Sequence, residues 1–209
     1  MGNDLAHPHT ASAAVDVVSM NYRYAGAWHE VNARIAQRQN ALNIYVSLAS
    51  GIVGILFAAG RGVAGAAANP TSFVWLLPVI SVAFAFLNYK HDVTIALLRR
   101  FMAECEQHNR DKHPELLLLG YNSSGFYMAL ADSARKFHDL SSAALVLLFN
   151  TIGAVVAYTS SPDSFAHSAG PMVAYFAVVT FAMWHVTRAS WRPYEFHDGS
   201  RGRSHSGGA

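Results

Sequence analysis

The chain has 209 residues, of which 52% are hydrophobic and only 13% are charged, against about 25% charged residues in a typical soluble domain. No Asp, Glu, Lys or Arg occurs in four long runs, at residues 39–60, 62–89, 140–162 and 164–187. Each run reaches the length of about 20 apolar residues that a helix needs to cross the hydrocarbon core of a membrane. This distribution excludes an ordinary soluble enzyme, a disordered protein and a disulfide scaffold.

We therefore predict an all-α integral membrane protein with four transmembrane helices and cytoplasmic helical extensions. The expected spans cover about residues 40–60, 72–89, 141–160 and 171–188. In chain order, we expect a flexible N-terminal tail, a first helical hairpin with its extensions, a cytoplasmic connector with a second hairpin, and a flexible C-terminal tail (1–21, 22–110, 111–191 and 192–209).

The basic residues predict how the chain is oriented. Of the 15 Lys and Arg residues, only Arg61 falls in the two short connections between the first and second spans and between the third and fourth. Loops rich in Lys and Arg stay in the cytoplasm. We expect both termini and the middle segment in the cytoplasm, with the chain in a bacterial inner membrane. Because topology accounts for the basic residues, they do not indicate nucleic-acid binding.

Three amphipathic stripes predict that helices continue beyond the membrane. Apolar residues recur at helical spacing before the first span, after the second and before the third. The stripes are Tyr24, Trp28, Val31 and Ile35; Ile95, Leu98, Met102 and Cys105; and Phe126, Leu130, Ala134 and Phe137. Since a helix in water needs a partner for such a face, we expect a cytoplasmic helical bundle, formed within one chain or between copies.

A polar residue lies near the middle of the third charge-free run. The Asn150 amide costs free energy in hydrocarbon unless it is hydrogen bonded or faces water. One interpretation is a hydrogen bond between helices of the bundle, and the other is a polar pore. For a pore or gate, the candidates are Asn150, Thr151 and Pro78, which predicts a kink in the second span.

Small residues at helix-packing spacing occur in the first and third spans. They are Ser47, Ser50, Gly51 and Gly54 in the first span, and Gly153 and Ala157 in the third. Such faces let helix backbones approach closely. The sequence leaves open whether the partner is another span of the same chain or a neighbouring subunit, and we predict a homo-oligomer.

Histidine and aspartate gather at the expected cytoplasmic interface. The residues concerned are His91, Asp92, His138, Asp139 and His185. A cluster of imidazoles and carboxylates could bind a transition metal or titrate near neutral pH. In the alternative interpretation, the two carboxylates form interfacial salt bridges with Lys90 or Lys136. No HxxxH or HExxH spacing supports a metal site.

No known catalytic or cofactor motif is present. The sequence contains no P-loop, nucleophile elbow, Gly-rich dinucleotide motif or Cys-based metal motif. The single cysteine, Cys105, is expected to be a small packing residue. We therefore expect no enzymatic activity, no cofactor and no bound metal.

The first half of the chain resembles the SLATT-type and related four-span proteins of bacterial nucleotide-signalling and anti-phage systems. The matching elements are WHEVNARIAQRQN at 28–40, Leu-Leu-Pro at 76–78 and KHDVTIALLRRFMAECE at 90–106. The membrane component of the Kiwa system is a further similar four-span protein. The resemblance covers about residues 22–110 and implies an oligomeric membrane effector or sensor. SLATT proteins have two spans, so the second pair of spans in this chain departs from their layout.

These observations predict an oligomeric inner-membrane effector or sensor in anti-phage defence. It would act by permeabilising the membrane or by sensing its perturbation. Two alternatives remain. The first is a membrane scaffold whose cytoplasmic bundle recruits a soluble protein, and the second is an ion or small-solute channel of ordinary physiology.

Overall fold

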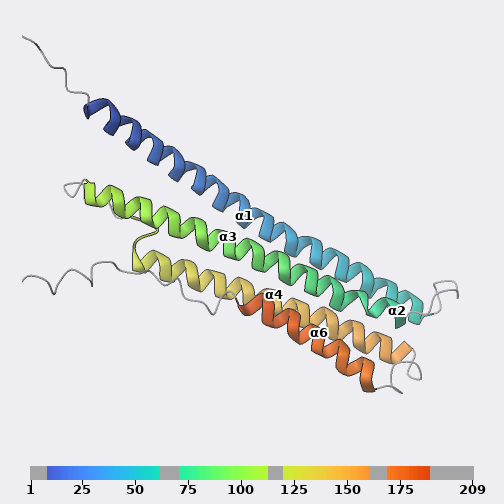
Figure 1. The fold of residues 1–209 in the computed structure, drawn as a ribbon. Helices are drawn as coiled ribbons and strands as arrows, with labels where there is room; N and C mark the ends of the chain where they lie inside the picture. The colour runs from blue at the N-terminus through green and yellow to red at the C-terminus, as the bar shows by residue number, and fades with distance from the viewer. Residues whose placement is uncertain (1–8, 62–70, 113–119, 161–168, 189–209) are drawn as a thin grey trace, which may run out of the picture.

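The computed structural model describes residues 9–61, 71–112, 120–160 and 169–188. These residues form four long helices and one short helix, and they contain no strand (Figure 1). The helices are α1 (His9–Gly60), α2 (Thr71–Val74), α3 (Leu76–Lys112), α4 (Gly125–Ser160) and α6 (Ala169–Arg188). Four segments are long and apolar enough to cross a membrane: Met20–Gly60, Ser72–Lys112, Gly125–Thr159 and Gly170–Arg188. The predicted all-α fold with four candidate spans is confirmed.

The long helices form an antiparallel bundle in which consecutive helices run in opposite directions (Figure 1). α1 packs against α3 and α4, and α6 packs against the same two helices, so α1 and α6 lie across a diagonal. The start of α1 and the end of α6 point toward the same end of the bundle (Figure 1). The predicted location of both termini in one compartment requires this arrangement, although the compartment itself stays a prediction.

Three helices are much longer than the fourth. α6 has 20 residues, about 30 Å, which matches the thickness of the hydrocarbon core. α1 has 52 residues, about 78 Å. α1, α3 and α4 extend beyond α6 at one end, on the left of Figure 1. We call these parts the polar extension (residues 20–38, 90–112 and 125–139), and we call the charge-free parts of the four helices the apolar bundle.

The first helix begins earlier than expected. α1 starts at His9 instead of near residue 22, so part of the expected N-terminal tail is helical. Residues 9–20 contain no Gly or Pro and include three alanines, the residue with the highest helix propensity. Residues 1–8 and the C-terminal tail, 192–209, lie outside the described residues.

The second span is interrupted shortly before Pro78, the residue at which a kink is predicted. α2 ends at Val74 and α3 begins at Leu76. The Pro78 ring would collide with the carbonyl of the residue four positions earlier, Val74, if one helix continued through both. Pro78 instead occupies the first turn of α3, where its missing N–H has no intrahelical partner to lose.

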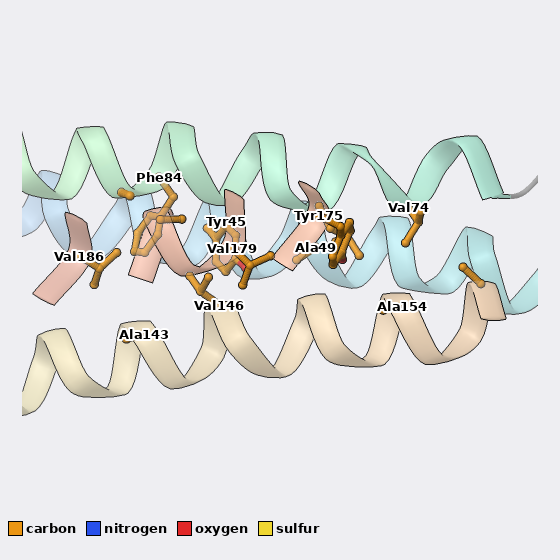
Figure 2. Close-up of a cluster of buried hydrophobic side chains, with 14 of the residues drawn as sticks. Tyr45, Ala49, Val74, Phe84, Ala143, Val146, Ala154, Tyr175, Val179 and Val186 are labelled. Atoms are coloured by element: carbon orange, nitrogen blue, oxygen red, sulfur yellow. The ribbon is translucent and has the colours of Figure 1, made fainter. Parts of the chain in front are cut away.

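Side chains from all four long helices fill the centre of the apolar bundle (Figure 2). Tyr45 of α1 stacks on Phe84 of α3 with ring centroids 4.9 Å apart. Val146 of α4 and Tyr175 of α6 are fully buried beside them. The core is therefore shared by every span.

Two of the three predicted stripes pack against each other within the chain. Val31 of α1 is buried with Ile95 and Met102 of α3 in a second apolar cluster. The third stripe does not join it, because Phe126, Leu130 and Phe137 of α4 are 60–74% exposed. Within the described residues no apolar cluster includes that stripe, and its packing between copies stays a prediction.

The small residues of the third span face the interior of the bundle. Gly153 and Ala157 are buried, and a Cβ built on Gly153 would collide with the Leu77 side chain and contact that of Val74. Gly153 therefore allows α4 to pack closely against α2 and α3, and Ala157 belongs to the core of the same chain. In contrast, the four small residues of the first span, Ser47, Ser50, Gly51 and Gly54, are exposed.

We expect Gly153→Val to destabilise the bundle by about 1–3 kcal/mol, because buried Leu77 has no room to move away. Thermal unfolding in detergent micelles measures the change. Gly125→Val is the control, since an added Cβ there meets nothing within 4 Å. Adding Leu77→Ala to Gly153→Val should restore part of the stability, and a Gly153→Val protein as stable as the wild type would contradict this packing.

Candidate functional site

A buried network of charged side chains lies at the junction of the apolar bundle and the polar extension. Arg38 immediately precedes the charge-free run of α1, and Asp139 immediately precedes that of α4. Asp92 follows the charge-free run of α3 by three positions, and Arg135 lies one helical turn before Asp139. Each of these four residues is at most 9% exposed. We call them, with Asn88 and His138, the ion network.

The ion network ties three helices together. The Arg38 guanidinium donates to Asn88 Oδ1 at 2.7 Å and to Asp92 Oδ1 at 3.3 Å, both on α3. It also donates to Asp139 Oδ1 on α4. Arg135 Nη2 lies 3.0 Å from Asp92 Oδ2. Arg38 of α1 thus binds both neighbouring helices at the same level.

The charges in the ion network balance. Two guanidinium groups face two carboxylates, which lowers the cost of removing all four from water. His138 Nδ1 also lies 2.8 Å from Arg38 Nη2, and since a guanidinium can only donate, the histidine nitrogen is placed as the acceptor.

The predicted salt bridging of Asp92 and Asp139 is confirmed, but the predicted lysine partners are wrong. Lys136 pairs with Asp132 at 2.8 Å, and Lys90 is exposed. Residues two apart on a helix do not face each other, so Lys90 cannot reach Asp92. Arg38 and Arg135 were not predicted as partners, although the sequence holds a signal for them: both arginines and both aspartates lie close to the ends of charge-free runs, at the ends expected on the same side of the membrane.

The histidines do not converge. His185 of α6 lies among aromatic rings, with centroids 5.2 Å from Phe86, 6.1 Å from Tyr89 and 4.5 Å from Phe181. His91 lies half-buried on α3 beside Asp92, and its Nδ1 has no hydrogen-bond partner within the described residues. Among the described residues, no three His, Cys, Asp or Glu side chains are placed to hold a metal ion.

Asn150 lies inside the apolar bundle. Its Nδ2 donates to Ser81 Oγ of α3 at 2.9 Å, and its Oδ1 accepts from the Tyr175 hydroxyl of α6 at 3.1 Å. This geometry is that of the interhelical hydrogen bond. Thr151 lies on the outer surface, so the structure does not bring these two pore candidates together.

A second polar cluster closes the far end of the polar extension. The Glu106 carboxylate of α3 accepts from the backbone N–H groups of Asn122 and Ser123, which directly precede α4. It also accepts from the Tyr24 hydroxyl of α1 at 2.9 Å. Burial, together with the hydrogen bond to Glu106, raises the pKa of Tyr24 to about 12. Ser124 is the N-cap of α4, since its carbonyl accepts from the Met128 N–H.

Cys105 lies half-buried on α3 beside this cluster. Burial first, and then the neighbouring Glu104 carboxylate, raise the pKa of its thiol. A thiol that stays protonated is a poor nucleophile, which is consistent with a packing role.

Comparison with known proteins finds no relative. No protein-family model matches the chain, and neither does any curated protein or solved structure. The resemblance to SLATT-type and Kiwa membrane proteins therefore stays a prediction from residues 22–110.

We expect Arg38→Met to destabilise the bundle by about 3–5 kcal/mol, because it leaves two buried carboxylates facing a single guanidinium. Denaturant titration followed by circular dichroism measures the change. Arg100→Met is the matched control, since the Arg100–Glu104 pair is 69% and 60% exposed and such pairs contribute at most about 1 kcal/mol. The double variant Arg38→Met, Asp139→Leu should be more stable than Arg38→Met alone. Equal losses of stability in Arg38→Met and Arg100→Met would show that the ion network does not stabilise the bundle.

Proposed function

We propose that this chain is an oligomeric effector or sensor of the bacterial inner membrane that acts in anti-phage defence, by permeabilising the membrane or by sensing its perturbation. The observation that carries the proposal is the ion network, which joins α1, α3 and α4 where the polar extension meets the apolar bundle. The assignment to defence rests on the resemblance of residues 22–110. The excess of Lys and Arg outside the two short connections supports a cytoplasmic location of the polar extension.

The ion network has the properties of a switch between two arrangements. When the two arginines and two aspartates are paired, their charges balance and their side chains are buried. When separated, each charge must be hydrated, so water would enter the junction. A ligand or partner that moves one helix of the polar extension would change this balance, because Arg38 is bonded to both neighbouring helices. Since side chains fill the bundle centre, permeation requires repacking of the spans or a path between copies.

Asp92→Asn tests the proposed coupling. The substitution leaves Arg38 and Arg135 facing one carboxylate, so the junction should hydrate without any signal. We expect cells that make this variant to depolarise in the absence of phage, as measured with a voltage-sensitive dye. Cells that make the wild-type chain should keep their potential until infection and should give fewer plaques than cells with an empty vector.

Glu104→Gln is the control, since it neutralises a carboxylate of the same helix that is 60% exposed. It should behave as the wild type, and both variants must be present in the membrane in equal amounts. Plaque counts equal to those of the empty vector, together with an unchanged potential in Asp92→Asn cells, would refute the proposal.

One observation favours the scaffold alternative. Phe126, Leu130 and Phe137 form an exposed apolar stripe on the part of α4 that belongs to the polar extension, and such a surface fits a protein partner. A scaffold should leave the potential of cells unchanged in every variant, whereas Leu130→Ser should abolish its function. The channel alternative instead predicts ion flux through liposomes that falls in Asn150→Leu.

A further inference from the structure

The face of α1 that points away from the core is polar inside the charge-free run. Tyr45, Ala49 and Leu56 of α1 are buried in the core. The residues on the opposite side of the helix are all exposed, and we call them the outer polar face: Asn43, Ser47, Ser50, Gly51 and Gly54. Large apolar side chains that suit lipid lie beside this face, with Ile44 and Leu48 about half exposed.

The side chain of Asn43 has no hydrogen-bond partner in the part of the chain that the structure describes. Within the described residues its side-chain amide forms no hydrogen bond, and only its backbone carbonyl is used, by the Ser47 hydroxyl at 2.9 Å. Lipid tails supply no donor or acceptor, so an amide exposed to hydrocarbon is costly. Asn150, an asparagine within another span, contrasts with Asn43. Its amide nitrogen donates to Ser81 and its amide oxygen accepts from Tyr175.

The outer polar face continues along the polar extension. Along this side of α1, exposed residues that are small or polar recur every three or four positions, after a first step of seven. They are Gly26, Ala33, Ala36, Asn40, Asn43, Ser47, Ser50 and Gly54. This spacing keeps one side of a helix in contact with a parallel helix over several heptads. An added Cβ at Gly26, Gly51 or Gly54 meets nothing within 4 Å of the same chain, so a second backbone has room to approach.

We infer that the outer polar face of α1 is the contact surface between two copies of this chain. A soluble partner cannot reach residues inside the charge-free run, whereas a second inserted copy carries its own Asn43 at the same depth. In a twofold dimer each residue meets its equivalent, so each Asn43 amide can donate to the carbonyl of the other. This inference rests on the oligomer of the proposed function and names the helix that forms it.

Cysteine cross-linking in native membranes tests the inference. In a Cys105→Ser background the chain has no other cysteine. We expect Asn43→Cys and Ser50→Cys to form covalent dimers on oxidation. The controls, Ala144→Cys and Thr151→Cys, are exposed positions of α4 that lie equally far into their own charge-free run, and we expect them to remain monomeric.

Other cross-linking results would overturn the inference in distinguishable ways. Dimers at Ala144 or Thr151 but not at Asn43 would place the contact on α4 and leave the proposed oligomer intact. Labelling of the Asn43→Cys and Ser50→Cys variants by a membrane-impermeant maleimide, without cross-linking, would show that the face lines water. Absence of dimers at all four positions would refute this interface. The expected dimers without protection from phage would support the interface and refute only the proposed function.

Asn43→Leu provides a second measurement. We expect it to weaken dimerisation about seven- to thirtyfold, the value of the two reciprocal hydrogen bonds between membrane helices, as measured by energy transfer between labelled copies in liposomes. Asn43→Gln should retain dimerisation. Because the Asn43 side chain is exposed and unpaired within the described part of the chain, thermal unfolding of the monomer should not change. Dimerisation as strong in Asn43→Leu as in the wild type would overturn the inference.

Discussion

Hydrocarbon offers no hydrogen-bond partner, and the arrangement of polar side chains in this bundle follows from that constraint. Arg38 cannot remain charged beside a span unless the protein itself solvates it. Asn88, Asp92, His138 and Asp139 do so together. Because these four residues come from two other helices, satisfying one guanidinium sets the relative heights of α1, α3 and α4.

Polar contacts recur at three levels along the bundle axis. Glu106 joins α1, α3 and the start of α4 at the end of the polar extension. The ion network joins the same three helices at the junction. Asn150 joins α4 to α3 and α6 within the apolar bundle. Each level fixes the register of helices whose apolar faces alone would tolerate sliding, since packing between apolar surfaces has little directionality.

The sequence predicts those features that depend on neighbouring residues. Four charge-free runs define the spans, and apolar spacing predicts that Val31 and Ile95 face a partner. The contacts of the ion network could not be predicted in this way, because Arg38 and Asp92 are 54 positions apart and meet only through tertiary packing. Thr151 shows the same limit at short range, since helical geometry turns it to the outer surface while its neighbour Asn150 is buried.

The unbroken length of α1 has a mechanical consequence. No Pro interrupts it from His9 to Gly60, so it behaves as a stiff rod held near its middle by Arg38. The 30 residues from His9 to Arg38 span about 45 Å, so a tilt of about 5° at the ion network displaces the far end by about 4 Å. Conversely, moving the His9 end of α1 by several ångströms would rotate the helix slightly at the ion network, where its charged side chains are paired.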